Sequence, residues 1–266
     1  MNARALVVAT LLTGAAHAQP APEETVTLVA AGDVVVHRRV AAAATGHAAD
    51  GGYAWVLRPL RAELPPDAVA FANLETPLSE RYRRPGNVTP PVLGADPSLA
   101  AALAATGFDV VSLANNHAYD QTGGGLSDTM EALRAARLAF VGAGPTAAEA
   151  DRAVVVQRGA LRVAVVAFTD RVNASPGDTA RGVALALSPD GRRVRAALRA
   201  ARAGADVVVL SIHWSRDFVY APTSAQRASR TLSAPPRRIA TITAVGTLSV
   251  GTPMTFIAVS GRPPMA

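Results

Sequence analysis

Metal-binding and acid–base side chains occur in four short segments of this 266-residue chain, each directly after an apolar run of strand length. The segments are Gly32-Asp33 with His37 four residues later, Asn73-Leu74-Glu75, Asn115-Asn116-His117 with Asp120, and His213-Trp214. Carboxylates, amide oxygens and neutral imidazoles are the ligands of hard and borderline divalent metals. Two such ions about 3.5–4 Å apart share a carboxylate in many sites and activate water for phosphoryl or acyl hydrolysis. These residue types therefore point to a divalent-metal site.

Each segment also has a purely structural interpretation. Gly-Asp after a strand is often only a turn, and Asn73 and Glu75 could simply cap the next element. His37 stands beside two arginines, as in an exposed helix, and His213 before a tryptophan fits a core histidine. Residues 115–117 are the hardest to explain in this way, because three polar groups directly follow an apolar strand.

The elements that must position these residues follow from apolar runs and helical spacing. Strands are expected at 26–31, 68–71, 110–113, 153–156, 162–168 and 207–212. Helices are expected at 53–64, 97–106, 126–136 and from Ser188-Pro189 to about Ala203, with Gly204 ending the last one. Gly159 between two apolar runs predicts a tight hairpin and so a mixed sheet. Alternating strands and helices predict an α/β fold with its site at the carboxyl ends of the strands.

The composition excludes several kinds of chemistry. All 26 basic residues are arginine, so Schiff-base and P-loop lysines are absent, and with no cysteine there are no thiol nucleophiles, disulfides or cysteine metal sites. The net charge is +6, but the arginines are scattered and aromatic residues make up only 5% of the chain. Stacking platforms are therefore scarce, and we expect no nucleic-acid partner.

The N-terminus has the pattern of a signal peptide. A short basic start is followed by an apolar run over residues 5–16, and Ala16 and Ala18 place small side chains where a signal peptidase reads them. The run is too short to span a bilayer, which needs about 20 residues. We expect residues 1–18 to be removed near Ala18, with 19–25 as a linker. The mature protein would be periplasmic or secreted, without a permanent membrane span.

Taken together, the order and spacing of these motifs resemble the CapA-type capsule (poly-γ-glutamate) synthesis proteins of the calcineurin-like metallophosphatase superfamily. The resemblance is carried by Ala31-Gly32-Asp33, Asn73-Leu74-Glu75, Ala114-Asn115-Asn116-His117 with Asp120, Gly125-Leu126 with Thr129, and His213-Trp214 with Pro222 and Gln226. It implies a domain over residues 26–228 with the layered α/β/β/α sandwich of the metallo-dependent phosphatases and with atypical C-terminal strands.

The resemblance also implies roles for individual residues. The metal ligands would be Asp33, His37, Glu75, Asn116 and His213, holding two divalent ions of Mn, Fe or Zn. His117 and Asp120 would be catalytic, and Asn73, Asn115 and Trp214 would bind substrate. The activity would be metal-dependent hydrolysis or transfer in the synthesis of an anionic envelope polymer such as poly-γ-glutamate. The partners would be that polymer or the subunits of its synthase.

The chain departs from the family pattern after Arg227. The family continues with a helix, a Gly-Ala-Asp strand and a Gly-His-x-x-His block, whereas residues 229–266 contain no acidic residue and no histidine. We therefore expect a divergent tail in which the final strands of the family are missing or unrecognisable, although residues 239–250 could form one strand or two. One hypothesis is a frameshift near Gln226, and it fails if neither other reading frame of the gene encodes a Gly-His-rich continuation. Two alternatives to an enzyme follow: a non-catalytic accessory that binds polymer or synthase, or an inactive truncated relic.

Overall fold

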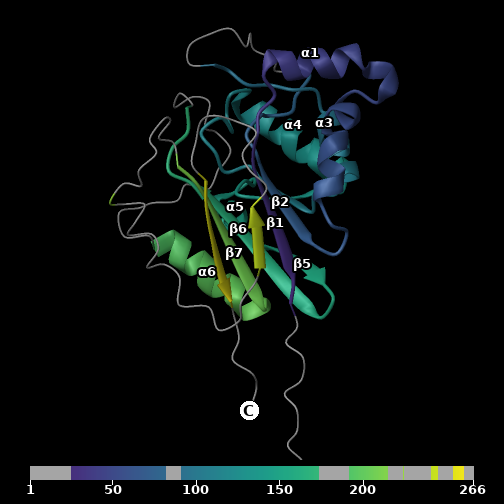
Figure 1. Cartoon of the computed structure of the whole chain (residues 1–266). Coiled ribbons are helices and arrows are strands. Elements are labelled where there is room, and N and C mark those ends of the chain that lie inside the picture. The colour runs from purple at the N-terminus through teal and green to yellow at the C-terminus, as the bar shows by residue number, and fades with distance from the viewer. Residues whose placement is uncertain are drawn as a thin grey trace, which may run out of the picture.

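The computed structural model describes residues 25–81, 91–173 and 192–214, Ser224, and the strands 241–244 and 254–260. In this part of the chain, two β-sheets lie face to face and helices cover their outer faces (Figure 1). The first sheet has the strand order β4-β3-β2-β1-β8, and the second has the order β5-β6-β7-β9.

The first sheet is entirely parallel. Its strands are β1 (Thr27–Val34), β2 (Val69–Leu74), β3 (Val110–Ser112), β4 (Ala139–Val141) and β8 (Thr241–Ala244). Between Ala30 and Asp33, β1 contains one more residue than the facing part of β2, and this bulge sets Asp33 opposite Asn73. All the carboxyl ends of this sheet therefore meet at one edge, with Asp33 and Asn73 paired across it.

The second sheet is mixed. It contains β5 (Val154–Arg158), β6 (Leu161–Thr169), β7 (Val207–His213) and β9 (Met254–Ser260). β6 and β7 are parallel, whereas β5 and β9 run antiparallel to their neighbours. Gly159 turns the β5–β6 hairpin with a φ of 54°, a backbone conformation that favours glycine. The predicted hairpin and the predicted mixed sheet are both confirmed.

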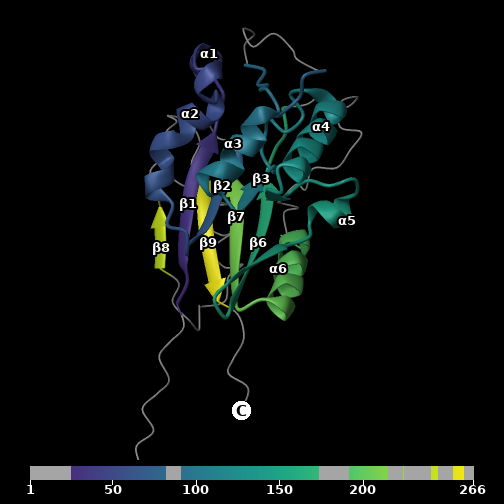
Figure 2. The same ribbon diagram turned by 90° about the vertical axis from the view of Figure 1, so that its right-hand side faces the viewer.

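Helices cover both outer faces. Those over the first sheet are α1 (Arg38–Gly46), η1 (Ala48–Asp50), α2 (Tyr53–Leu57), η2 (Arg58–Glu63), α3 (Ser98–Thr106) and α4 (Thr122–Ala135). α6 (Arg192–Gly204) packs on the second sheet, and α5 (Ala147–Ala150) contributes a residue to the same core. Figure 1 shows α3 and α4 on one side of the stacked sheets and α6 on the other, and Figure 2 views the molecule from the side of α3 and α4.

Three apolar cores separate these layers. One lies under α1–α4 and contains Leu74, Leu103 and Leu126, and a second lies between the sheets and contains Phe71 and Val163. The third lies between the second sheet and α6, with Phe168, Leu198 and Leu210 among its members. Because each sheet buries both faces, its strands form almost continuous apolar runs. The predicted α/β/β/α sandwich is confirmed.

Individual elements differ from the sequence-based expectation where local chemistry changes. The helix expected over 53–64 is divided into α2 and the 3₁₀ helix η2, because Pro59 in the first turn of η2 has no N–H to continue an α-helix. α4 begins four residues earlier than expected, so Gly123–Gly125 lies inside the helix. α1, β4 and α5 were not expected. The predicted helix start at Ser188-Pro189 lies outside the described residues.

The tail supplies one strand to each sheet. β8 pairs in parallel with β1, and β9 pairs antiparallel with β7 along its full length. β8 lies within residues 239–250, where one strand or two were expected, whereas β9 follows that range. The predicted signal peptide, Pro222 and Gln226 lie outside the described residues. Among the described helices, none combines the length and apolar character needed to cross a membrane.

Candidate metal centre

The polar residues at the strand ends come together at one edge of the sandwich. Asp33 lies near the end of β1, Glu75 directly follows β2, and residues 115–117 follow β3. His213 is the last residue of β7 in the second sheet. The centre therefore contains side chains from both sheets, because the parallel strands of both sheets end at this edge.

Asp33, Glu75 and His213 form a buried triad. Each offers a donor atom, and the three atoms lie within 4.8 Å of one another. His213 Nδ1 is 3.8 Å from Asp33 Oδ1, and His213 Nε2 is 3.7 Å from Glu75 Oε1. Two carboxylates and an imidazole at this spacing form the donor set of a divalent-metal site.

Asn116 orients the imidazole of His213. Its Oδ1 lies 2.7 Å from His213 Nε2, and an amide oxygen only accepts hydrogen bonds. This contact therefore places the proton of neutral His213 on Nε2 and leaves the lone pair on Nδ1, toward Asp33. Holding one ring nitrogen by a hydrogen bond is how proteins direct the other nitrogen to a metal.

Asn115 and Asn73 form a chain of amides behind the triad. Asn115 Oδ1 accepts the backbone N–H of His117 at 3.1 Å, which fixes the orientation of this amide. Its Nδ2 then donates to Asn73 Oδ1 at 3.2 Å and to the Leu74 carbonyl at 2.9 Å. Asn73 Nδ2 in turn donates to Asp33 Oδ1 at 2.9 Å. Both asparagines are fully buried, so these contacts hold the Asp33 carboxylate in place.

The second oxygen of Asp33 shows that the triad fits a cation. Asp33 Oδ2 is buried and has no hydrogen-bond partner among the described residues. An unsatisfied buried carboxylate oxygen is costly, and a bound cation removes that cost. The residues present therefore fit a divalent metal ion.

His117 and Asp120 form a hydrogen-bonded pair next to the triad. Asp120 Oδ2 accepts from His117 Nδ1 and from the backbone N–H of Leu93, both at 2.6 Å. This leaves His117 Nε2 directed toward the triad, 3.9 Å from Glu75 Oε1. An imidazole held in this way is suited to hold or move a proton at Nε2.

A model of the family "Bacterial capsule synthesis protein PGA_cap" matches residues 27–232. The chain belongs to this family. The capsule biosynthesis protein CapA of Bacillus anthracis is 28% identical over 213 residues, which cover 77% of this chain and 50% of the relative. The PGA biosynthesis protein CapA of Bacillus subtilis is 29% identical over 45% of this chain and 32% of its own length. The chain thus spans half or less of these curated relatives.

Solved structures also match this chain. The sulfate thiohydrolase SoxB of Thermus thermophilus, in complex with glycerol, aligns with a TM-score of 0.36 and 17% identity. The alignment covers 60% of this chain and 29% of that one, a likeness too weak to support an argument. The match to the PGA_cap model ends at residue 232, shortly after Arg227, where the sequence departs from the family pattern.

Two residues with predicted roles lie apart from the centre of this PGA_cap protein. His37 is exposed at the N-cap of α1 and does not belong to the triad. Trp214 is 2% exposed and packs in the core between the second sheet and α6, and its Nε1 has no hydrogen-bond partner within the described part of the chain. Metal binding by His37 and substrate binding by Trp214, Asn73 and Asn115 stay predictions.

The segment after β6 reaches the centre, although sequence reasoning did not include it. The backbone N–H of Asn173 donates to the Asn116 carbonyl at 2.7 Å, and that of Asp170 donates to the His213 carbonyl at 3.3 Å. Asp170 directly follows β6, two residues after the apolar run 162–168, and a polar residue at a strand end is the same signal that identified the other segments. The segment supports the backbone on which Asn116 and His213 are placed.

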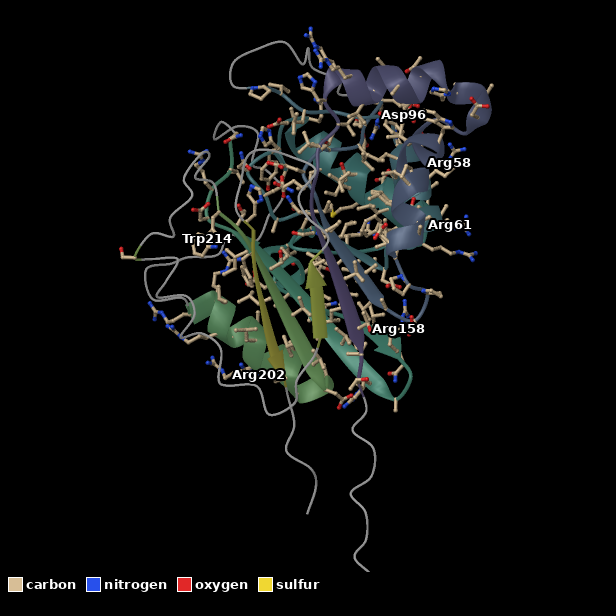
Figure 3. The ribbon with its side chains drawn as sticks, viewed as in Figure 1. Arg58, Arg61, Asp96, Arg158, Arg202 and Trp214 are labelled. Atoms are coloured by element: carbon tan, nitrogen blue, oxygen red, sulfur yellow. The ribbon has the colours of Figure 1, made fainter. Side chains whose placement is uncertain are left out.

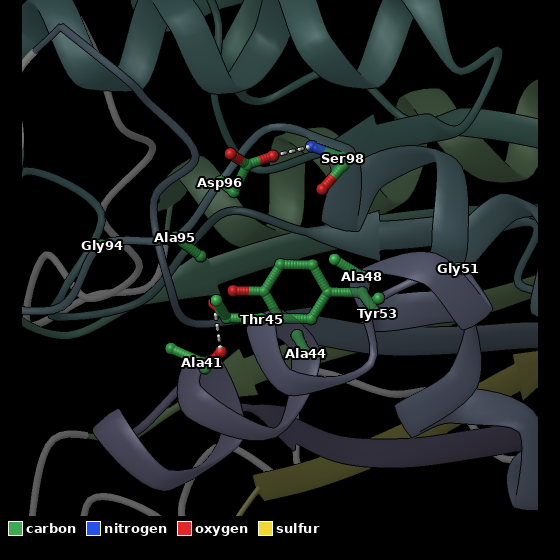
Figure 4. Close-up of a pocket in the computed structure, with 11 residues that line it drawn as sticks. Ala41, Ala44, Thr45, Ala48, Gly51, Tyr53, Gly94, Ala95, Asp96 and Ser98 are labelled. Atoms are coloured by element: carbon green, nitrogen blue, oxygen red, sulfur yellow. Dashed lines mark hydrogen bonds between the residues drawn. The ribbon is translucent and has the colours of Figure 1, made fainter.

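A separate cavity of about 590 Å³ lies among α1, the turn before α2 and the start of α3. Alanine and glycine residues form most of its wall, with the Tyr53 ring and Asp96 among its few larger side chains (Figure 4). Asp96 Oδ1 accepts the backbone N–H of Ser98 at 2.9 Å. No triad residue lines this cavity, so it is distinct from the metal centre.

Proposed function

We propose that this PGA_cap protein holds a divalent metal ion at Asp33, Glu75 and His213 and acts as a metal-dependent hydrolase or transferase in capsule polymer synthesis. The observation that carries the proposal is the buried triad with one unsatisfied carboxylate oxygen. The capsule biosynthesis names of the relatives support the choice of pathway. The ion is Mn, Fe or Zn, because carboxylate and imidazole ligands suit these metals.

Each group around the triad has a distinct task in this proposal. When bound, the ion supplies Lewis-acid polarisation of a phosphoryl or acyl oxygen and lowers the pKa of a water. Asn73 holds the Asp33 carboxylate, and Asn116 holds the His213 imidazole. His117 holds or delivers a proton at Nε2, while Asp120 keeps its Nδ1 occupied.

The triad accounts for one ion. The family resemblance predicts two, and a second ion would need further ligands, for which Asn116 and His37 are the candidates named by the sequence. Asn116 Oδ1 already accepts from His213 Nε2, so a second ion would have to use the other lone pair of this oxygen. The metal stoichiometry therefore decides between one ion and two.

The proposal includes export and a polymer partner. Cleavage near Ala18 would place the mature chain in the periplasm or outside the cell. Its partners would be an anionic envelope polymer or the subunits of its synthase. The relatives named for capsule and PGA biosynthesis support this partner class.

Metal content is the decisive measurement. We expect near-stoichiometric Mn, Fe or Zn in the purified mature chain by elemental analysis. Asp33→Asn should lose the metal while keeping its far-ultraviolet circular dichroism. His47→Asn is the matched control, since His47 is a partly exposed histidine on another face that contacts Asp50. Absence of metal in the wild-type chain after reconstitution with each ion would overturn the proposal.

A non-catalytic accessory is the alternative function. The exposed side chains of Arg195 and Arg199 on α6 favour it, because guanidinium groups bind carboxylates. Polymer affinity that survives EDTA, together with no metal-dependent turnover of phosphodiester or γ-glutamyl amide substrates, would select this alternative. Protease sensitivity throughout the chain would instead indicate an inactive relic.

A further inference from the structure

Gln121 is a fully buried polar residue to which the proposed function assigns no role. It directly follows Asp120 and is the N-cap residue of α4, but its side chain makes no capping hydrogen bond. Its Nε2 instead donates to the backbone carbonyl of Leu93 at 2.9 Å, 28 residues away in the sequence. Because a carbonyl oxygen only accepts, this contact fixes which way the amide faces. The side chain of Gln121 therefore holds Leu93 and does not cap the helix.

Asp120 and Gln121 together hold both polar backbone groups of Leu93. The Leu93 N–H donates to Asp120 Oδ2 at 2.6 Å, and the Leu93 carbonyl accepts from Gln121 Nε2. The same Asp120 oxygen accepts from His117 Nδ1, also at 2.6 Å. Because the N–H and the carbonyl belong to one residue, holding the carbonyl also limits how far the N–H can move from Asp120.

The chain around Gln121 leaves space for this contact. A Cβ at Gly94 would lie 2.8 Å from Gln121 Nε2, and a Cβ at Gly125 would clash with Gln121 Cβ. Thr122, the next residue, has a φ of 64°, which is costly for a β-branched side chain. Such strain persists only where surrounding contacts fix the backbone. The contacts of Asp120 and Gln121 with Leu93 fix the turn that precedes Thr122.

We propose that Gln121 is a positioning residue for the pair His117–Asp120. By holding Leu93, it keeps the Asp120 carboxylate directed at His117 Nδ1, and His117 Nε2 then faces the triad, 3.9 Å from Glu75 Oε1. The use of this pair in proton transfer rests on the proposed function, whereas the effect of Gln121 on its orientation does not.

The consequence for turnover depends on the leaving group. In hydrolysis of a phosphodiester, water adds to phosphorus, the bond to the leaving oxygen breaks, and that oxygen takes up a proton. A weakly acidic phenol or alcohol needs this proton from an acid such as His117 at Nε2, whereas 4-nitrophenolate leaves without it. A misoriented His117 therefore slows only the first kind of substrate, while a general loss of structure slows both.

The first test measures the orientation of the pair without turnover. In the chain labelled with ¹⁵N-histidine and treated with EDTA, the His117 Nδ1 proton should give a low-field NMR signal, because it is bonded to a carboxylate. His117→Gln assigns the signal by removing it. Gln121→Met has a side chain of similar length that cannot donate. It should make this proton exchange with water about tenfold faster.

Gln157→Met is the matched control for this substitution. Gln157 Nε2 also donates to a backbone carbonyl, at 2.7 Å within the β5–β6 hairpin. Figure 3 shows Arg158, next to Gln157, at the end of the molecule opposite to Asp96, which is three residues after Leu93. The control should therefore leave the His117 signal and its exchange rate unchanged.

Gly94→Ala tests the contact without changing Gln121. The added Cβ would lie too close to Gln121 Nε2 and should displace the amide from the Leu93 carbonyl. We expect faster exchange of the His117 proton, as in Gln121→Met, but with a smaller change. Gly46→Ala is its control, because a Cβ there meets nothing within 4 Å. This second pair of variants decides the question if Gln121→Met does not fold.

The second test uses the metal-loaded chain and two methyl phosphodiesters, with phenol or 4-nitrophenol as the leaving group. Gln121→Met should lower kcat about tenfold for the phenyl ester and less than about threefold for the 4-nitrophenyl ester, with KM unchanged. Val194→Ala, a buried change in α6, controls for lost stability and should lower neither kcat.

Two results would overturn the proposal. One is an equal loss of kcat for the two esters in Gln121→Met. The other is an unchanged exchange rate of the His117 proton in both Gln121→Met and Gly94→Ala. Absence of turnover in the wild-type chain would contradict the proposed function instead, and the NMR signal would still decide whether Gln121 positions the pair.

Discussion

The side-chain amide of Asn115 donates to Asn73 Oδ1 at 3.2 Å, and this contact directs Asn73 Nδ2 to Asp33. The two residues are 42 positions apart in the sequence and lie at the ends of neighbouring strands. Neither is accessible to solvent. Because of this contact, the orientation of the proposed metal ligand Asp33 in β1 depends on Asn115, which follows β3.

Asn115→Asp should weaken metal binding by about 10–100-fold, the range found when a group that orients a ligand is lost. An aspartate has no N–H for Asn73 Oδ1 or for the Leu74 carbonyl. Calorimetric titration with Mn²⁺ or Zn²⁺ measures the change. Gln157→Glu, the same amide-to-acid change at an exposed position of the β5–β6 hairpin, is the control and should bind as the wild type does. Unchanged affinity in Asn115→Asp would show that the amide chain does not position Asp33.

His117→Gln should lower turnover by about 100-fold or more while leaving the metal content unchanged, as expected for an acid–base group. Asp120→Asn should act in the same direction with a smaller effect, because its remaining amide oxygen can still accept one of the two hydrogen bonds. Metal-dependent hydrolysis of a phosphodiester and elemental analysis provide the two readouts. Loss of metal from His117→Gln comparable with that from Asp33→Asn would instead make His117 a ligand.

Gly142→Ala should lower the free energy of unfolding by about 2–4 kcal/mol. Gly142 has a φ of 83°, and a Cβ there would lie 2.5 Å from the Cβ of Ala114, directly before Asn115. Gly46→Ala is the control, because a Cβ at the end of α1 meets nothing within 4 Å. It should be neutral or stabilise by about 0.5–1 kcal/mol. Urea denaturation compares the two, and equal stability would contradict the close approach of β4 to the centre.

Asp128→Asn should destabilise the protein at neutral pH by about 1–3 kcal/mol and have less effect in acid. Burial alone would raise the pKa of Asp128, but hydrogen bonds from Arg81 and Ser79 and the charge of Arg81 outweigh it, so the pKa lies below its ordinary value. A lowered pKa contributes stability above the unfolded-state pKa, and this is lost as the pH falls through the folded-state value. The difference between wild type and variant should therefore shrink below about pH 4.

Urea midpoints from pH 3 to 7 measure this dependence. Asp67→Asn is the control, since Asp67 is exposed, and it should change stability by less than about 0.5 kcal/mol at every pH. A constant difference between wild type and Asp128→Asn across this range would contradict the assigned pKa direction.

Much of the fold follows from local patterns. The apolar runs that become β1, β2, β3, β6 and β7 are each placed within a few residues, because strands buried on both faces leave a continuous signal. β4 and α5 have three and four residues, too short for a periodic signal. The alanine-rich α1 was missed because its start carries no signal: His37 makes no side-chain capping hydrogen bond, and the first turn has no acidic residue. The pairing of β8 and β9 with distant strands has no local signature at all.

By itself, the sequence determined which residues gather at the proposed centre. Parallel strands end at one edge, so polar residues after successive strands must meet there. Only the tertiary structure decided which of them form the triad and which hold the triad side chains in place. The reason is that the bulge in β1 and the amide hydrogen bonds depend on contacts between segments far apart in the chain. It selected Asp33, Glu75 and His213 as the triad and set His37 outside it. It also buried Trp214, whose apolar ring packs against α6.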